Sequence, residues 1–342
     1  MGASLRLAQI GIAHTHATKT VDTAARALWP RLGVELSGIF EPDPEMWEAR
    51  HGREEYADVH WFQSPDEILE DDDIPAVYIE TWPWECVEWA RLALEAGKHV
   101  HLDKPPGTSL PALRSLLDLA AERGLCVQMG YQWRFNPGLQ FIQQKIKEGL
   151  LGRVFFARFR AGSIPEYYHR NHVDRYPGGI MQEEACHLFD QVVTMFGRAD
   201  KITSFLRSDA KGFEGIVPGV DNASVMLEFD DQGAMAVIET TSMECDAGPH
   251  RRVEIHGEDG SVILEPIEPP KLEMSLRVPR DGYGTGWQSV EVADRPRYVG
   301  DHVEFIQIIR GEREPIYSRE HDLLTQETLI RACGGDLGDV PE

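Results

Sequence analysis

The strongest constraint on the fold is an alternation of strand-like and helix-like segments at the start of the chain. Short apolar runs such as Leu5–Ile12, Val34–Phe40 and Ala76–Ile79 are separated by segments with helical spacing of apolar residues. Strand–helix pairs joined by short loops predict a parallel sheet with helical crossovers. A barrel would need about eight such units, and the pattern changes too early for that. We therefore expect a doubly wound α/β domain of the Rossmann type over residues 1–130.

The connecting segments predict particular elements. A long first helix is expected over His14–Leu28, and a short strand over Val59–Phe62. Later helices are expected over Trp84–Ala96 and Ser109–Arg123, because each ends at a glycine. The remaining strands of the sheet are expected at Lys98–Leu102 and Leu125–Met129.

After a helix expected over Asn136–Gly149, the second part of the chain has a different pattern of predicted elements. Short strands separated by Gly, Asp and Asn turns predict a largely antiparallel open sheet, at Arg153–Ala161, Lys201–Leu206, Ala223–Phe229, Ala234–Thr241, Arg252–His256 and Ser261–Glu265. One helix is expected at Met181–Phe196, a loop at Ile267–Pro296, and terminal helices at Asp301–Ile309 and Asp322–Ala332. We expect residues 131–342 to form an α+β domain for substrate binding and oligomerisation, whose C-terminal helices could pack back on the first domain.

Charge and composition exclude several classes of partner. The chain has 34 basic and 57 acidic residues, for a formal net charge of −23. A field of this sign repels nucleic acid and anionic lipid surfaces. The five cysteines are widely spaced, which is typical of a reduced compartment, and the start of the chain is unlike a secretory signal peptide. We expect a cytoplasmic protein with neither nucleic-acid nor membrane partners.

The turn Gly11-Ile12-Ala13-His14-Thr15-His16 follows the first strand. In a doubly wound domain this turn binds a dinucleotide pyrophosphate through backbone N–H groups. The usual pattern is G-x-G-x-x-G, and here Ala13 and His16 replace the second and third glycines. By itself the motif is weak, and a purely structural turn is the alternative.

Two further residues lie where a dinucleotide site would need them. Glu41 closes the second strand, where a carboxylate accepts ribose hydroxyls and repels a 2′-phosphate, which favours NAD over NADP. Lys104 follows the strand at Lys98–Leu102, at the edge of the sheet where ligands bind. The alternatives are a turn acid before Pro42 and a surface lysine.

The segment around His187 is the richest in possible chemistry. On a continuous helix, Glu183, His187 and Asp190 would lie on one face. Carboxylates beside a histidine fix its tautomer and raise its basicity, as a general base requires. The alternative is a helix whose polar residues meet only solvent.

Histidine pairs suggest a second kind of site. His14 and His16 form one H-x-H pair, and His99 and His101 form another. Paired histidines at the end of a strand can bind metals, as in metallohydrolases. Packed or solvent-facing histidines are the more common outcome, so we expect no metal ligands.

Four blocks resemble the Gfo/Idh/MocA family of oxidoreductases, which includes glucose–fructose oxidoreductase and inositol dehydrogenase. Ala96-Gly97-Lys98-His99-Val100 with Asp103-Lys104-Pro105 resembles the family's E-A-G-K-H-V…E-K-P signature, with Asp103 in place of Glu. The other blocks are Gly130–Pro137, Gly149–Val154 and Gly178–Asp190, and in the last of these Glu183 replaces Asp and Ala185 replaces Gly.

The resemblance implies roles for individual residues. Lys104 would contact the substrate hydroxyl and the nicotinamide ribose, and His187 would be the acid/base with Glu183 beside it. The cofactor site would be formed by Gly11, Ile12, Ala13, His14, His16, Glu41, Thr81, Pro83, Asp103 and Lys104. Candidate contacts to substrate hydroxyls, besides His187, are Tyr131, Arg134, His169, His172 and Asp174.

These observations predict an NAD-dependent oxidoreductase that oxidises a secondary hydroxyl of a sugar or cyclic polyol. Two alternatives stay open at this point. One is NAD-dependent, redox-assisted glycosidic cleavage or isomerisation. The other is a metal-using hydrolase or a sugar-binding protein on a decayed Rossmann scaffold. An open sheet face of the second domain has to be covered, which predicts oligomerisation. The resemblance implies a homodimer or homotetramer.

Overall fold

The computed structural model describes residues 4–21, 23–170, 172–210 and 219–339. The chain divides into two compact units, of which the first comprises Met1–Gln132 and Pro296–Arg319. The second comprises Trp133–Arg295 and Glu320–Glu342. The chain therefore returns to the first unit once, late in the sequence, before it ends in the second. Among the described residues no helix is both long and apolar enough to cross a bilayer.

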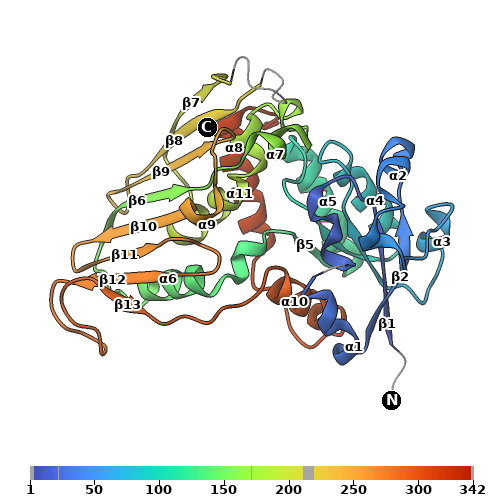
Figure 1. Ribbon diagram of the computed structural model, residues 1–342, viewed down its shortest axis with the longest axis horizontal. Coiled ribbons are helices and arrows are strands. Elements are labelled where there is room, and N and C mark those ends of the chain that lie inside the picture. Colours follow the sequence, from blue (N-terminus) through green and yellow to red (C-terminus); the bar gives the residue numbers. More distant parts are fainter. Residues whose placement is uncertain (1–3, 22, 171, 211–218, 340–342) are drawn as a thin grey trace. The chain divides into compact units, whose positions relative to one another are not determined.

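The first unit is built on a five-stranded parallel sheet in the order β2-β1-β3-β4-β5 (Figure 1). The strands are β1 (Leu5–Ile10), β2 (Val34–Phe40), β3 (Ala76–Ile79), β4 (His99–Leu102) and β5 (Val127–Met129). Trp61 adds a single parallel bridge to Ile39, beyond β2. That bridge is all that forms of the strand expected at Val59–Phe62. With it the sheet follows the Rossmann order, whose strand order reverses between β1 and β3.

Helices of the first unit pack on this sheet. They are α1 (Trp29–Leu32), α2 (Pro44–Arg50), α3 (Asp66–Leu69), α4 (Cys86–Glu95), α5 (Leu110–Arg123) and α10 (Val299–Ile309). α4 packs on β3, β4 and α5. Trp29 of α1 and Phe305 of α10 join a core cluster with Leu7, Val34 and Tyr78 of the sheet. The late return of the chain thus completes the core of the first unit.

The described residues of segment 14–28 do not form the long helix expected at His14–Leu28. The segment instead forms two short 3-10 helices, η1 (Thr15–Thr20) and η2 (Arg26–Leu28), followed by α1. Its threonines bond elsewhere: Thr20 Oγ1 donates to Gln9 Oε1, and Thr23 Oγ1 donates to the Lys19 carbonyl. Such local side-chain bonds compete with regular helix formation.

The second unit is built on an eight-stranded sheet in the order β13-β12-β11-β10-β6-β9-β8-β7. All neighbours pair antiparallel except β6 and β9. The strands are β6 (Val154–Arg160), β7 (Lys201–Arg207), β8 (Asn222–Phe229), β9 (Ala234–Thr241), β10 (Arg252–Gly257), β11 (Gly260–Leu264), β12 (Leu272–Leu276) and β13 (Gln288–Val290). The loop expected at Ile267–Pro296 was wrong, because β12 and β13 form within this segment. Leu272, Met274 and Leu276 alternate into the core, so the segment carries a strand period despite its prolines.

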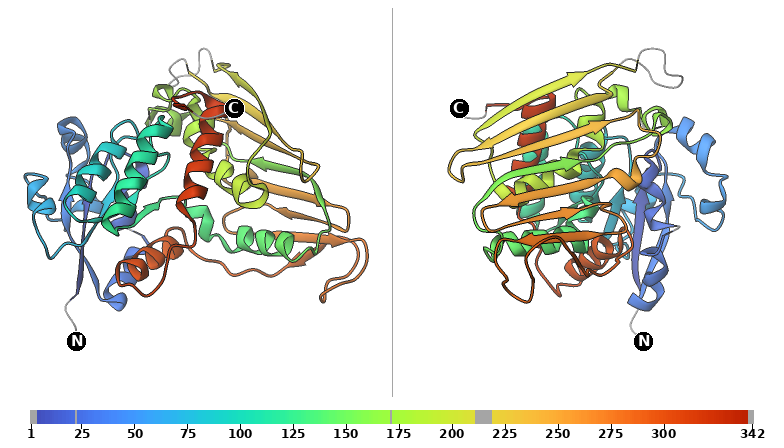
Figure 2. Two further views of the ribbon diagram at one scale, coloured as in Figure 1. Left: turned by 180° about the vertical axis from the view of Figure 1, so that it is seen from behind. Right: turned by 60° about the vertical axis from the view of Figure 1, so that its left-hand side comes forward.

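Helices cover one face of the large sheet (Figure 2). They are α6 (Pro137–Lys147), α7 (Pro165–Arg170), α8 (Gly179–Glu183), α9 (Cys186–Phe196) and α11 (Arg319–Cys333). α8 packs on β8 and β9, α9 on β9, and α6 on β11. Within the described part of this unit, no helix covers the opposite face. The short 3-10 helices η3 (Glu54–Tyr56), η4 (Gln132–Phe135), η5 (Val173–Arg175) and η6 (Gly248–His250) complete the described elements.

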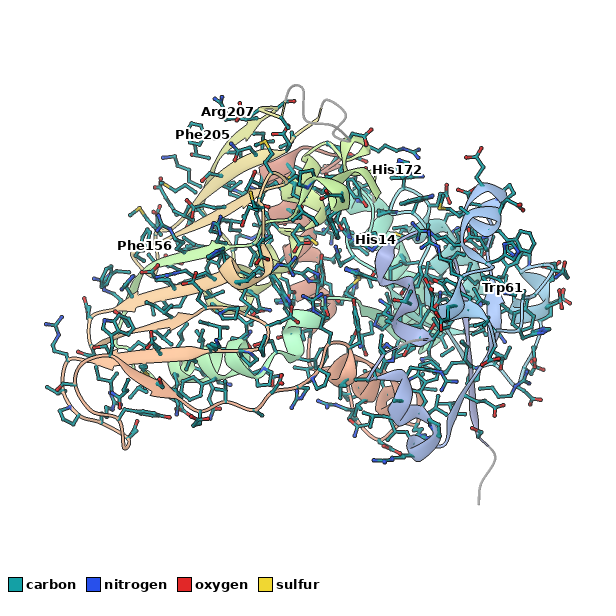
Figure 3. All side chains as sticks on the ribbon, in the orientation of Figure 1. His14, Trp61, Phe156, His172, Phe205 and Arg207 are labelled. Carbon is teal, nitrogen blue, oxygen red and sulfur yellow. The ribbon has the colours of Figure 1, made fainter. Side chains whose placement is uncertain are left out.

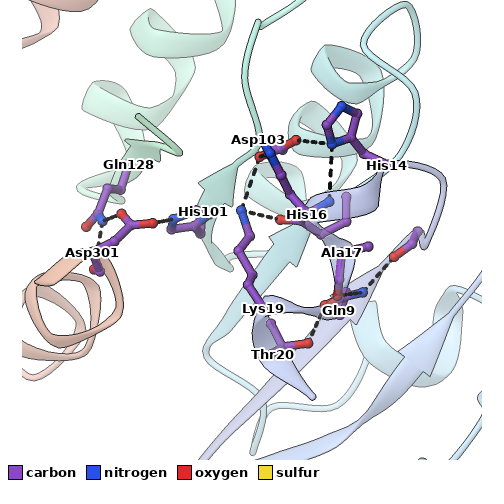
Figure 4. Close-up of polar contacts among 12 residues, drawn as sticks. Gln9, His14, His16, Ala17, Lys19, Thr20, His101, Asp103, Gln128 and Asp301 are labelled. Atoms are coloured by element: carbon purple, nitrogen blue, oxygen red, sulfur yellow. Dashed lines mark hydrogen bonds and ion pairs between the residues drawn. The ribbon is translucent and has the colours of Figure 1, made fainter. Parts of the chain in front are cut away.

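A buried ammonium group lies inside the first unit (Figure 4). Lys19 is 1% exposed, and its Nζ lies 2.8 Å from Glu80 Oε1 and 3.1 Å from Asp103 Oδ1. Burial would lower the pKa of Lys19, but the two carboxyl groups raise it above its ordinary value. Burial would raise the pKa of Asp103, but Lys19 holds it well below its ordinary range. Burial raises the pKa of Glu80 to about 8. The cluster therefore holds one ammonium, one carboxylate and one protonated carboxyl group at neutral pH.

This proton on Glu80 gives the folding stability a pH dependence. The pKa of Glu80 rises from 4.5 to about 8 on folding, so the folded state binds more protons than the unfolded state between those values. Glu80 by itself should make the free energy of unfolding fall as the pH rises through this window, by at most about 1.4 kcal/mol per pH unit. Glu80→Gln should remove this contribution and so make the measured slope more positive than in the wild type, whereas Glu122→Gln on the exposed side of α5 should keep the wild-type slope. Urea unfolding at several pH values measures it, and equal slopes in all three proteins would contradict the assignment.

Candidate functional site

The turn after β1 packs directly against the segment after β3. Gly11 has a φ of +96°, and a Cβ placed on it would lie 2.5 Å from the Thr81 nitrogen. Only glycine fits this conformation and this distance. The turn therefore lies at the point where the strand order reverses, which is the ligand crevice of a doubly wound sheet.

Glu41 follows β2 and folds back onto the same turn. Its Oε2 accepts a hydrogen bond from the Ile12 nitrogen, and its Oε1 accepts one from the Asp43 nitrogen at 2.7 Å. Burial raises the pKa of Glu41 to about 7, although both backbone bonds favour the carboxylate. The carboxyl group thus lies beside the turn, as expected for a group that binds a ribose.

The turn itself carries two histidine rings. His14 Nδ1 accepts a hydrogen bond from the His16 nitrogen at 3.2 Å, and the two ring centroids are 4.4 Å apart. Burial, followed by the neighbouring His14, lowers the pKa of His16 to about 3. Each ring lies within 3.8 Å of the Asp103 carboxylate (Figure 4). Sequence reasoning placed these three residues around a cofactor, and the structure brings them together.

The same three side chains have the composition of a metal site. Ligand atoms from His14, His16 and Asp103 all lie within 4.8 Å of one another. However, the Asp103 carboxylate already has a cation, because Lys19 Nζ lies 3.1 Å away. A divalent ion here would face that buried ammonium at close range. The second histidine pair has a different role: His101 Nε2 lies 3.0 Å from Asp301 Oδ2 of α10, and His99 Nδ1 accepts a bond from the Cys126 nitrogen.

The remaining candidates of the first unit are buried at the ends of its strands. Thr81 and Pro83 follow β3, and the Pro83 carbonyl accepts a hydrogen bond from Cys86 Sγ at 3.3 Å. Lys104 follows β4 and is 0% exposed, and Tyr131 follows β5 and is 1% exposed. Ala13 donates its N–H to the Glu80 carbonyl at 3.1 Å.

His187 lies in the second unit, in the first turn of α9. Its ring packs against Trp133 in a tilted arrangement, with centroids 5.0 Å apart and 35° between the ring planes. Glu183 ends the preceding helix α8, and its Oε1 accepts a hydrogen bond from the Tyr167 hydroxyl at 2.9 Å. Burial, together with Glu183, raises the pKa of Tyr167 well above its ordinary value, so Tyr167 stays a neutral donor.

The single helix expected at Met181–Phe196 is broken at Glu184 and Ala185 into α8 and α9. Gly179 begins α8 at a φ of +51°, where a Cβ would lie 2.0 Å from the Val220 carbonyl oxygen. This close approach to the chain before β8 sets the direction of α8, and α9 starts anew at Cys186. Glu183, His187 and Asp190 therefore do not share one continuous helix face.

Asp190 and Arg134 bind each other. Arg134 Nη2 lies 2.7 Å from Asp190 Oδ1 and 2.6 Å from Asp322 Oδ1 of α11, and His321 Nε2 lies 3.0 Å from Asp190. Burial would raise the pKa of Asp190, but Arg134 and His321 bring it below its ordinary value. The guanidinium that sequence reasoning assigned to substrate hydroxyls is thus held between two buried carboxylates.

The last three candidates precede α8. His172 has a left-handed backbone with a φ of 48°, which is unusual for a residue other than glycine. Asp174 is half-buried in the turn η5 (Figure 3 labels His172). His169 lies in α7, but its side chain is outside the part of the chain that the structure describes.

Four residues near these candidates were missed by sequence reasoning: Lys19, Trp133, Tyr167 and Arg251. Lys19 had a weak signal, because a lone lysine interrupts a segment that was expected to be helical. Trp133 lay in a block that resembled the family but received no role. Tyr167 and Arg251 had no signal in the sequence, because only tertiary packing brings Tyr167 to Glu183 and Arg251 to Trp133.

Relatives with curated names are oxidoreductases. The chain is 28% identical over 215 residues to the uncharacterized oxidoreductase YrbE of Bacillus subtilis, covering 61% of this chain and 60% of that protein. It is 27% identical over 290 residues to YhhX of Escherichia coli, covering 81% and 79%. It is 26% identical over 227 residues to the NAD-dependent scyllo-inositol 2-dehydrogenase of Bacillus subtilis, covering 65% and 64%. The chain thus spans less than two thirds of the first and third of these relatives.

Solved structures share the fold over nearly the whole chain. UDP-N-acetylglucosamine 3-dehydrogenase from Acidithiobacillus ferrooxidans matches with a TM-score of 0.77 and 17% identity, covering 97% of each chain. An oxidoreductase from Agrobacterium radiobacter in complex with NAD+, L-tartaric acid and magnesium matches with a TM-score of 0.77 and 16% identity, covering 96% and 95%.

Two family models match the chain in sequence. Residues 6–131 match the oxidoreductase family with an NAD-binding Rossmann fold, and residues 139–263 match the GFO/IDH/MocA C-terminal domain. The two matches are consecutive, and each covers most of one sheet. The chain therefore belongs to the Gfo/Idh/MocA family of NAD-binding oxidoreductases.

Proposed function

We propose that the protein oxidises a secondary hydroxyl of a sugar or cyclic polyol with NAD as the hydride acceptor. The observation that supports this most is that the His187 imidazole packs against Trp133, while Glu183, four residues earlier, accepts a hydrogen bond from the neutral Tyr167 hydroxyl. Aromatic faces and hydrogen-bonding groups of both kinds suit a polyhydroxylated ring. The scyllo-inositol dehydrogenase relative acts on a molecule of this class by its name.

The first unit has residues that fit a dinucleotide. Gly11 lets the turn approach closely where a Cβ would collide with the Thr81 backbone. Glu41 would accept the ribose hydroxyls, and its charge would oppose a 2′-phosphate. Around them, Ile12, Ala13, His14, His16, Thr81, Pro83, Asp103 and Lys104 would complete the site. The bound nicotinamide supplies the hydride acceptor.

In this proposal His187 takes the proton of the substrate hydroxyl, and Glu183 helps to orient the substrate. Lys104 stabilises the developing alkoxide with its positive charge. Tyr131, His172 and Asp174 are proposed hydroxyl contacts. Lys104 follows β4, at the edge of the sheet where ligands bind, and is 0% exposed.

The first test is replacement of His187 by Ala. Turnover with the best substrate of a sugar and polyol screen should fall at least ~10²-fold, because the general base is lost. The dissociation constant for NADH should stay within about twofold, because His187 is proposed to act on the substrate alone. The exposed His250→Ala serves as the matched control. Undiminished turnover would remove His187 from the mechanism, and sugar conversion without NADH accumulation would favour redox-assisted cleavage or isomerisation.

The second test concerns the cofactor. Fluorescence titration should show NADH binding at least about tenfold tighter than NADPH, equivalent to roughly 1.4 kcal/mol of discrimination. The pKa of Glu41 is about 7, so its carboxylate fraction and the discrimination should both grow between pH 6 and pH 8. Glu41→Gln should abolish this trend, and Glu45→Gln, on the exposed side of α2, should keep it. Equal affinity for both cofactors at pH 8 would contradict the role of Glu41.

The open face of the large sheet is the proposed contact between copies of the chain. Phe205, Met226 and Met235 are 64%, 41% and 44% exposed on adjacent strands, and Phe156 pairs with Met235 (Figure 3). Exposed apolar side chains on a sheet face favour association. Light scattering should give the mass of a dimer or tetramer, and Phe205→Glu should lower it. Val278→Glu, at a residue 60% exposed beyond the end of β12, should not. A monomeric wild-type protein would contradict this proposal.

A further inference from the structure

Arg251 lies beside the pair of packed rings formed by Trp133 and His187. Its side chain leaves the backbone just before β10, and its guanidinium is 5.8 Å from the centroid of the Trp133 ring. Its Nη2 also lies 2.6 Å from Glu184 Oε1. The two partners are largely buried, with exposed side-chain fractions of 16% and 6%. His187, Trp133, Arg251 and Glu184 therefore form a continuous set of contacts within the second unit.

Two hydrogen-bond donors of this set are buried without an acceptor among the described residues. They are Trp133 Nε1 and Arg251 Nε. Trp133 is 1% exposed. Buried donors are nearly always satisfied, and one left without a partner destabilises the fold. Two such donors next to the proposed acid/base indicate that a ligand supplies the acceptors, as the hydroxyl and ring oxygens of a sugar do.

The charges around His187 decide which ligands are accepted. The charges of Arg251 and Glu184 cancel, because Arg251 Nη2 lies 2.6 Å from Glu184 Oε1. Glu183 adds a second carboxyl group, and Tyr167, bonded to it, is kept neutral by its raised pKa. Arg134, on the same unit, is held by Asp190 and Asp322. Within the second unit, the charged groups named here, Arg251 with Glu184 and Arg134 with its two carboxylates, thus contribute donors without a net positive charge.

We propose that the Glu184–Arg251 pair makes the protein selective for uncharged polyols, such as free sugars and cyclitols, over their carboxylated or phosphorylated counterparts. The arginine donates hydrogen bonds to the ligand, while the glutamate cancels the charge that would otherwise bind an anion bidentately. This inference rests on the proposed function only for the location of the substrate beside His187. It assigns to Glu184 a role in specificity that does not involve the reacting atoms.

The test compares matched ligands that differ only in charge. Calorimetric titrations of the NAD-saturated protein would use D-glucose against D-glucuronate, D-galactose against D-galacturonate, and myo-inositol against its monophosphate. The wild-type protein should bind the neutral member of at least one pair about tenfold tighter or more. Glu184→Gln leaves Arg251 charged and unpaired, so the ratio should move at least about tenfold toward the anion, as expected for a buried charge whose partner is lost. Glu258→Gln should leave it unchanged, because the Glu258–Arg153 pair lies at the far end of β10 and is exposed.

A second variant guards against misfolding of Glu184→Gln. The double variant Glu184→Gln with Arg251→Gln removes both charges and should return the selectivity for the neutral ligand. The inference would be overturned if the wild-type protein bound the anion more tightly than the neutral sugar. It would equally be overturned if the neutral-to-anion affinity ratio were the same in the wild type and Glu184→Gln, or if neither member of any pair bound.

The outcomes separate this inference from the proposed function. Selective binding of a neutral sugar without NADH formation would contradict the dehydrogenase proposal and support the selectivity proposal. NADH formation from a uronate as fast as from the neutral sugar would support the dehydrogenase proposal and contradict the selectivity proposal.

Discussion

The buried ammonium of Lys19 is the interaction on which the first unit depends most. It joins the carboxyl groups that follow β3 and β4 to the segment that follows β1. Three chain segments that are far apart in sequence therefore share one buried charge, and the pairing is strict because an unpaired charge at this depth would be very costly. Asp103 is also the partner of both histidine rings in the turn after β1. The position of Lys104, the next residue, follows from this network.

The second unit shows the same principle with a different result. Arg134 is fully committed to Asp190 and Asp322, and so fixes α9 to α11. Among the described residues, Arg251 forms an ion pair with Glu184, and its Nε is buried without an acceptor. The two arginines thus differ in the number of carboxylates around them, which depends on how distant parts of the chain pack.

The strands were the most predictable part of the fold. The bounds expected for β2, β3 and β9 agree with the structure, because their apolar runs are short and are bounded by turn residues. The helices were less predictable. The segment from His14 to Leu28 has helical spacing, but its threonines bond to Gln9 and to the backbone, and Lys19 points into the interior. The break between Glu183 and Cys186 depends on the approach of Gly179 to Val220, which no local pattern encodes. For the same reason the motif residues Gly11, Glu41, Lys104 and His187 could be chosen from sequence, whereas Lys19, Tyr167 and Arg251 could not.

The late return of the chain to the first unit has a consequence for biosynthesis. Asp301 of α10 binds His101 and Gln128 of the parallel sheet, and Phe305 completes its core. A ribosome that has released only the first 130 residues has therefore not yet supplied a side of this core. The core of the Rossmann sheet therefore lacks one side until every strand of the second sheet and then α10 have been synthesised. The second unit is completed later still, because α11 follows α10 in the chain.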